Sequence, residues 1–135
     1  MKIIPHLNFN GQCEEAFILY ANVLGGEPKF FRFGESPAVA QAPEGWAQKV
    51  LHASLQVGDQ MIYGADVPPR HQQPAQGFAV TLDMTDVDKA GQVFKGLSAG
   101  ANVKMAFAET FWARRFGHLV DRFGTPWMVN VSKPM

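Results

Sequence analysis

One histidine in this sequence stands where an imidazole could reach a small molecule. His52 lies in KVLHASLQV, whose alternation predicts a strand with one apolar face, formed by Leu51, Ala53, Leu55 and Val57. A helix must cover that face, so the other face, with Val50, His52, Ser54 and Gln56, is expected to border a cleft. An imidazole can take or give a proton near neutral pH, which makes His52 a catalytic candidate. The alternative is a solvated histidine without a chemical role.

A second candidate group lies in the block ETFWARRFGHLVDRFGTPWMVNV (109–131). Glu109 precedes Phe111 and Trp112, and rings beside a carboxylate would withdraw it from water, as a general acid or base requires. Trp112 offers a flat ring for stacking on a ligand. The alternative is a surface loop whose tryptophan packs on the other half of the chain.

Strand alternation adds binding candidates in the same block. Arg114 and His118 are both even-numbered, so both are expected on the cleft face, where Arg114 could hold a carboxylate or phosphonate. An ion pair across a dimer is the alternative for Arg114. A three-residue turn over 122–124, which Asp121 would serve, pairs Met128 with His118 on that face.

The first hairpin leaves two registers open. A two-residue turn at Gly58-Asp59 places Tyr63 on the cleft face beside Ser54, and a three-residue turn places Ile62 there.

These residues sit on a pattern that occurs twice, each time as strand, helix and three strands. Helical spacing predicts one helix over 12–24, with Ala16, Leu19, Tyr20 and Val23 on its apolar stripe. A second helix, capped by Thr85 or Asp86, carries Ala90, Val93, Phe94 and Leu97 at the same spacing. The expected strands are 2–9, 27–33, 49–57, 60–65, 78–84, 103–107, 113–120 and 127–131. Gly58 aligns with Gly124, which lays His52 on His118.

The repeat predicts an α+β fold of two tandem βαβββ modules that form cupped, mostly antiparallel eight-stranded sheets. We expect one domain over 1–135, with module 1 at about 1–66, a connector at 67–77 and module 2 at about 78–135. Each helix should cover one sheet face, and the other faces should form a cleft. The long loop over 34–46 is of the kind that forms lids or binding loops.

Composition excludes several classes of partner. The 12 basic residues equal the 12 acidic ones, so neither nucleic acid nor an anionic membrane is expected. No apolar run approaches the ~20 residues of a membrane helix, and the N-terminus does not resemble a signal peptide. Cys13 is the single cysteine, which precludes an intramolecular disulfide and favours the cytoplasm. It falls in the first helical turn, where we expect a half-buried, inert thiol rather than a reactive one.

Three blocks carry a family resemblance: PHLNFNGQCEEAFILYANVLGGE (5–27), KVLHASLQVGD (49–59) and the 109–131 block. They resemble the vicinal-oxygen-chelate superfamily of glyoxalases, bleomycin-resistance proteins and dioxygenases, in particular its phosphonate-operon glyoxalase-like branch, often labelled demethylubiquinone methyltransferase. The resemblance implies the paired-module fold, usually a homodimer, and a metal-centred or hydrophobic pocket inside each sheet.

The metal ligands of that superfamily map to four places here: Pro5 or His6, Ile62 or Tyr63, Phe78 or Ala79, and Met128. Only His6 could bind a divalent metal, so no metal is expected at these positions and no cofactor is predicted. The alternative is a divalent metal at a relocated site, held by His52 and Glu109. A common-fold S-adenosylmethionine methyltransferase is not expected either, since the first strand-to-helix turn, Asn10-Gly11-Gln12, lacks a Gly-x-Gly.

Two functions compete. The first is a lyase, isomerase or dioxygenase of unknown substrate that uses His52 or Glu109 for proton transfer, with Ser54, Tyr63, Trp112, Arg114, His118 and Met128 contacting the ligand. The second is a non-catalytic dimer that sequesters a small molecule by ring stacking. We favour the first, with a working pocket that includes His52, Glu109 and Trp112.

Overall fold

Residues 1–134 are described by the computed structural model, and they form two compact units, Met1–Gln73 and the segment from Pro74 on. The first unit contains β1 (His6–Phe9), α1 (Cys13–Leu24), β2 (Glu27–Arg32), β3 (Val50–Val57) and β4 (Gln60–Asp66). The second contains β5 (Val80–Met84), α2 (Val87–Ser98), β6 (Asn102–Ala108), β7 (Ala113–Val120) and β8 (Pro126–Ser132). Three short 3-10 segments, η1 (Phe33–Glu35), η2 (Pro37–Gln41) and η3 (Pro69–His71), lie in connections of the first unit. None of the helices within 1–134 has the length and apolar character to span a bilayer.

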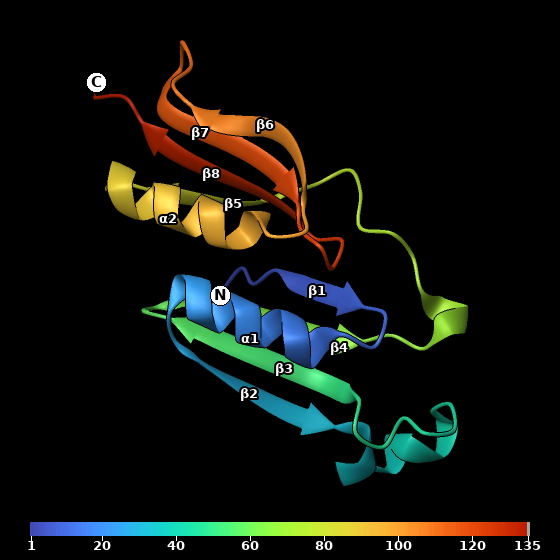
Figure 1. The fold of residues 1–135 in the computed structure, drawn as a ribbon. Helices are drawn as coiled ribbons and strands as arrows, with labels where there is room; N and C mark the ends of the chain where they lie inside the picture. The colour runs from blue at the N-terminus through green and yellow to red at the C-terminus, as the bar shows by residue number, and fades with distance from the viewer. Residues whose placement is uncertain (135) are drawn as a thin grey trace. The chain divides into compact units, whose positions relative to one another are not determined.

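Each unit holds one four-stranded mixed sheet. The strand orders are β1-β4-β3-β2 and β5-β8-β7-β6. One pair in each sheet is parallel, β1 with β4 and β5 with β8, and the other pairs are antiparallel. The α+β fold of two βαβββ modules is confirmed, with the eight strands shared equally between two sheets. The helix of each unit lies along one face of its own sheet (Figure 1).

The two helices bury different stripes. In α2 the predicted residues Ala90, Val93, Phe94 and Leu97 are the buried ones. In α1 the buried residues are Cys13, Ala16, Phe17 and Tyr20, so the stripe begins earlier than the sequence spacing suggested. The predicted Leu19 and Val23 are only half-buried, because the rings of Phe17 and Tyr20 pack on Phe9 of β1 instead.

The two helices are also capped differently. Asp86 accepts hydrogen bonds from the backbone N–H groups of Asp88 and Lys89, as its position in the sequence predicts. Gln12, at the start of α1, makes no side-chain cap. The buried Asp66 at the end of β4 replaces it: its carboxylate accepts from the N–H of Cys13 at 2.9 Å and from that of Val50 at 2.9 Å. One carboxylate thereby ties α1, β3 and β4 together.

The first strand is shorter than predicted. The sequence indicated 2–9, but pairing with β4 begins at His6 opposite Tyr63, and the N–H of Tyr63 donates to the carbonyl of Pro5 at 2.9 Å. Pro5 has no N–H to continue the ladder, which ends the strand on that side.

Both hairpin registers are defined. Val57 pairs with Gln60 across a two-residue Gly58-Asp59 turn, so Ile62 is buried opposite Leu55 and Tyr63 lies opposite Ser54. Of the two registers that the sequence left open, the structure has the one with Tyr63 rather than Ile62 on the face of Ser54. In the second hairpin His118 pairs with Met128 as predicted. Asp121 accepts hydrogen bonds from the N–H groups of Phe123 and Thr125 within the turn and from the indole of Trp127.

Candidate functional site

The face of the first sheet opposite α1 carries three of the predicted site residues. The sheet register places Tyr63 between His6 of β1 and Ser54 of β3. His52 lies further along β3, where it pairs with Phe31 of β2. His6 and His52 are exposed, and Ser54 and Tyr63 are half-buried. We call these four residues the histidine cluster.

The rings of the histidine cluster lie close together. The centroids of His52 and Tyr63 are 4.8 Å apart in an edge-to-face arrangement, and those of His6 and His52 are 6.5 Å apart. Edge-to-face contact fixes the orientation of an imidazole while its nitrogens remain available as donor and acceptor. The cluster therefore presents two imidazoles and two hydroxyl groups close to one another on one sheet face.

A bulge in β3 sets the position of His52. The pairing with β2 shifts between Phe31, opposite His52, and Arg32, opposite Val50. Val50 is consequently 1% exposed, which corrects its predicted place on the cleft face, and Leu51 is half-buried rather than part of the covered face. The N–H of Val50 donates to Asp66, so a buried carboxylate holds the bulge next to His52.

The corresponding face of the second sheet is more apolar. His118 pairs with Met128 and Met105, and the preceding alternate residue, Phe116, pairs with Asn130. His118, Phe116 and Met128 are all half-buried. This face therefore offers one imidazole among large apolar side chains.

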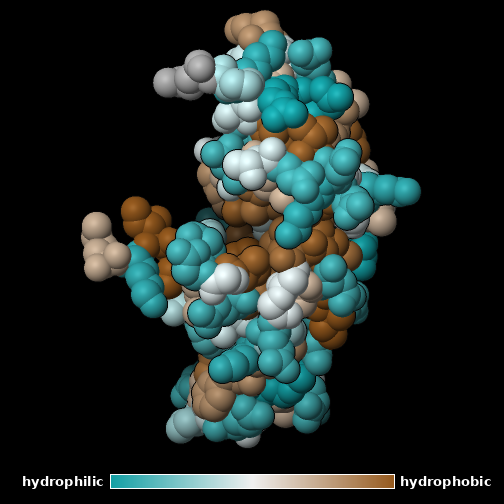
Figure 2. All heavy atoms as spheres, turned by 90° about the vertical axis from the view of Figure 1, so that its left-hand side faces the viewer, coloured by the Kyte–Doolittle hydropathy of each residue, from teal (hydrophilic) through white to brown (hydrophobic). Residues whose placement is uncertain are grey.

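An aromatic group extends from the turn between β6 and β7. Phe111 is 88% and Trp112 46% exposed, with ring centroids 4.8 Å apart, and Trp112 lies 5.5 Å from the ring of Phe116. The hydroxyl of Thr110 holds the turn by accepting from the N–H groups of Trp112 and Ala113. The view in Figure 2 shows hydrophobic areas (brown) set among hydrophilic ones on one side of the molecule. The exposed rings of Phe111 and Trp112 favour binding of flat apolar groups.

Two predicted site residues of this segment, Glu109 and Arg114, are exposed to solvent. The side chain of Glu109 is 68% exposed and faces Lys133 at 3.8 Å, so the expected withdrawal of this carboxylate from water does not occur within the described chain. Arg114 is exposed, and the pairing of β7 with β8 shifts between Ala113 and Arg115. That irregularity interrupts the alternation from which its face was predicted.

The structure thus groups the predicted residues within each unit. His52, Ser54 and Tyr63 share one face of the first sheet, and His118 and Met128 share one face of the second. Trp112 contacts Phe116. The sharing of one pocket by His52, Glu109 and Trp112 stays a prediction, because these residues belong to different units.

Sequence reasoning missed part of the site. It treated His6 only as a family metal position, although His6 pairs with Tyr63 on the face of His52. The alternation of EPKFFRF over residues 27–33 could have pointed to Lys29 and Phe31 on the same face.

Cys13 takes no part in this chemistry. Its side chain is 0% exposed, so it is fully rather than half buried, and burial together with Asp66 and Glu14 raises the pKa of the thiol. A thiol kept protonated in this way is a poor nucleophile.

The family metal positions do not fit a metal site. Of the residues to which the resemblance maps them, Pro5 precedes β1, His6 lies on β1, Ile62 and Tyr63 lie on β4, Phe78 and Ala79 precede β5, and Met128 lies on β8. Nowhere between residues 1 and 134 do three His, Cys, Asp or Glu side chains come together as metal ligands would.

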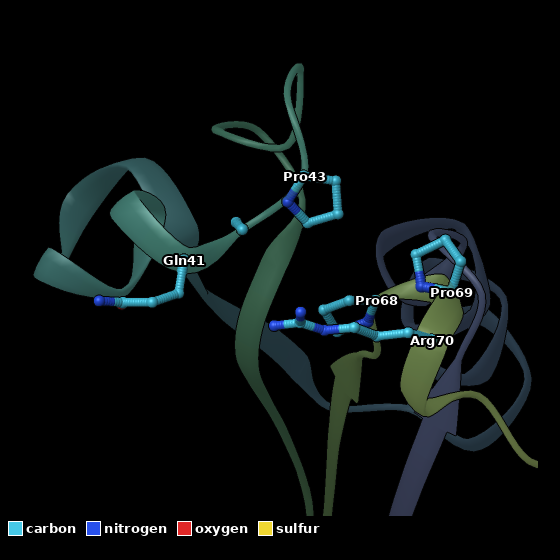
Figure 3. Close-up of a pocket in the computed structure, with 6 residues that line it drawn as sticks. Gln41, Pro43, Pro68, Pro69 and Arg70 are labelled. Atoms are coloured by element: carbon cyan, nitrogen blue, oxygen red, sulfur yellow. The ribbon is translucent and has the colours of Figure 1, made fainter.

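A cavity of about 320 Å³ lies elsewhere in the first unit. It is lined by Gln41, Ala42, Pro43, Pro68, Pro69 and Arg70. Figure 3 shows Gln41 and Pro43 on the segment of η2, and Pro68, Pro69 and Arg70 on the segment of η3. None of the predicted site residues lines it, so it is separate from the histidine cluster.

One family model and two relatives match nearly the whole chain. The family model described as 3-demethylubiquinone-9 3-methyltransferase matches residues 1–130. Protein YjdN of Escherichia coli is 35% identical over 142 residues, covering 98% of this chain and 97% of that protein. The crystal structure of PA1353 from Pseudomonas aeruginosa has 37% identity and a TM-score of 0.89, with 99% of each chain covered.

A more distant structure shows the fold alone. A glyoxalase/bleomycin resistance protein/dioxygenase family enzyme from Burkholderia phytofirmans has 12% identity and a TM-score of 0.65, covering 96% of this chain and 97% of that one. The chain therefore belongs to the 3-demethylubiquinone-9 3-methyltransferase family and has the glyoxalase/bleomycin-resistance fold.

Proposed function

We propose that the histidine cluster binds a small organic molecule and that His52 exchanges a proton with it, in a lyase- or isomerase-type reaction. The family has a small-molecule-binding fold. The observation that carries the proposal is the edge-to-face contact of His52 with Tyr63 at 4.8 Å on an exposed sheet face. This contact orients an imidazole whose nitrogens remain within reach of a ligand.

Solvent exchange into carbon acids tests the proton transfer. The protein is incubated in D2O with a panel of 2-oxo acids and 2-hydroxy ketones, and deuterium incorporation is followed by NMR. General-base catalysis contributes about 10²–10⁴-fold, so His52→Ala should lose most of any protein-dependent exchange. His71→Ala is the matched control, because His71 is an exposed histidine on η3 away from the sheet face.

The fold should not change in the His52→Ala variant. His52 is exposed, and surface substitutions usually alter the free energy of unfolding by less than about 0.5 kcal/mol. Exchange that survives in His52→Ala would end the catalytic proposal.

A second candidate function is binding without catalysis. The exposed rings of Phe111 and Trp112 favour it, since stacking on them would hold a flat apolar ligand. In this proposal Arg114 supplies a cation, Glu109 an acceptor, His118 an imidazole and Met128 an apolar surface. Trp112→Ala would then abolish ligand-dependent quenching of tryptophan fluorescence, whereas His52→Ala would not.

We also propose that the chain works as a homodimer in the cytoplasm. The dimer is supported by exposed hydrophobic side chains outside the candidate sites, such as Ile3, Ile18 and Phe78. The cytoplasm is supported by the lone buried Cys13. Light scattering at micromolar concentration tests the dimer, and a monomeric mass would contradict it.

A further inference from the structure

A lysine lies in the same cross-strand row as three members of the histidine cluster, Ser54, Tyr63 and His6. Lys29 of β2 pairs with Ser54 of β3, Ser54 with Tyr63 of β4, and Tyr63 with His6 of β1. Directly opposed residues on one face of an antiparallel pair, here Lys29 with Ser54 and Ser54 with Tyr63, have Cβ atoms about 4.5–5.5 Å apart. An ammonium group, two hydroxyl groups and an imidazole therefore follow one another across the sheet.

Lys29 lies nearer the centre of this face than the single carboxylate on it. Lys29 is exposed, and no ion pair of it is found within residues 1–134. Glu27 is the one carboxylate among the side chains that β1 to β4 direct to this face. It pairs with Gln56, in the cross-strand row next to the one that contains Lys29 and Ser54. The centre of the face thus presents hydrogen-bond donors and a free cation, a combination that complements an anion.

Aromatic side chains lie next to Lys29 on the same sheet face. Phe31 follows Lys29 by two residues on the same face of β2, is 45% exposed, and pairs with His52. His52 in turn contacts the ring of Tyr63. A flat ring attached to the anion could therefore lie against Phe31 and His52 while its charged group faces Lys29.

We propose that the first-sheet face binds an aromatic carboxylate, with the carboxylate held by Lys29 and the hydroxyl groups of Ser54 and Tyr63. The inference rests on the proposed function for the location of the site and adds the class of its ligand. Lys29 determines the preference for an anionic over a neutral ligand, because its ammonium group attracts a carboxylate and has no such attraction for an uncharged group.

Three probes test this: benzoate, the neutral benzamide of nearly the same shape, and inorganic phosphate. Each is titrated into the full chain while the side-chain NMR signals of His52 and Tyr63 are followed. Benzoate should shift both signals and bind more tightly than benzamide. Phosphate, which lacks a ring, should bind more weakly than benzoate.

Charge-removing variants separate the lysine from general electrostatics. Lys29→Met should weaken benzoate about two- to fivefold, as expected for an exposed charge pair, and leave benzamide unchanged. Lys104→Met is the matched control, since Lys104 is an exposed lysine of β6 in the other sheet, and it should change neither affinity.

The outcomes are distinct. Equal affinities for benzoate and benzamide, an unaffected Lys29→Met variant, phosphate binding as tight as benzoate, or unmoved His52 and Tyr63 signals would each overturn the carboxylate proposal. The proton-transfer function fails separately, if His52→Ala retains deuterium exchange. A charge-dependent shift of the His52 and Tyr63 signals by benzoate alone supports the site and its ligand class.

Discussion

Asp66 provides a quantitative test of how the candidate site is held in place. Its side chain is 3% exposed, and its two carboxylate oxygens accept from the N–H of Cys13 at 2.9 Å and from that of Val50 at 2.9 Å. Asp66→Asn keeps the shape but removes the charge and turns one acceptor into a donor that faces an N–H group. One buried backbone N–H then loses its acceptor, and the amide NH2 that faces it has none either.

The expected loss of stability is large for so conservative a change. An unsatisfied buried donor costs about 1–3 kcal/mol, and the remaining hydrogen bond loses its charge assistance. The loss of a carboxylate at the N-terminus of α1 adds about 0.3–1 kcal/mol. We expect the free energy of unfolding to fall by about 2–4 kcal/mol. A chain of this length has an unfolding entropy near 0.28 kcal/mol/K, so Tm should fall by about 7–14 °C.

Urea unfolding followed by circular dichroism measures the change. Asp59→Asn is the matched control, because Asp59 is exposed in the first hairpin turn and should alter stability by less than about 0.5 kcal/mol. Amide hydrogen exchange at Cys13 and Val50 should accelerate in Asp66→Asn alone. A variant as stable as the natural chain would refute the assignment of Asp66 as the anchor of α1 and of the β3 bulge.

Three further predictions concern packing and charge. Gly64→Ala should destabilise by about 1–3 kcal/mol, because the new Cβ would lie 2.5 Å from Cε1 of Phe17, and an added Phe17→Leu should recover part of the loss in a double-mutant cycle. Gly91→Ala, whose Cβ would meet its nearest neighbour at 3.6 Å, should instead stabilise α2 by about 0.5–1 kcal/mol; destabilisation there would contradict the packing argument. Arg32 donates two hydrogen bonds of 3.0 Å to Glu14, and these lower the pKa of that carboxyl. The pair therefore stabilises the fold at a pH above the ordinary pKa of a glutamate, about 4.3. This stabilisation is lost as the pH falls through the lowered pKa of Glu14. Glu14→Gln should therefore cost about 0.5 kcal/mol at pH 7 and nothing near pH 2 in pH-dependent urea unfolding, with the exposure of the pair keeping the value small.

Much of the fold could be predicted because it follows from the local spacing of apolar and turn-forming residues. The 3.6-residue spacing of Ala90, Val93, Phe94 and Leu97 identified the buried side of α2, since those residues alone must face the sheet. The sequence DRFGTP predicted the second hairpin, because Asp121 and Gly124 meet the demands of its turn; Gly124 has φ of 93°.

Site placement was predictable only as far as alternation runs unbroken. Ser54 and His52 were assigned to the open face correctly, but Val50 was not, because the bulge in β3 shifts the pattern by one residue. The same kind of irregularity before Arg115 left the face of Arg114 undetermined by alternation.

The sequence by itself determined the repeated order of elements, the helix and turn positions, and the candidate chemistry of His52. Tertiary structure alone decided which distant groups meet: Asp66 with the start of α1, 53 residues away, Lys29 with Ser54, and His6 with Tyr63. The physical reason is that periodicity states which face a residue occupies, whereas its neighbour on that face depends on strand order and register. Those are set by the packing of the whole sheet against its helix, and the site exists only once that packing is complete.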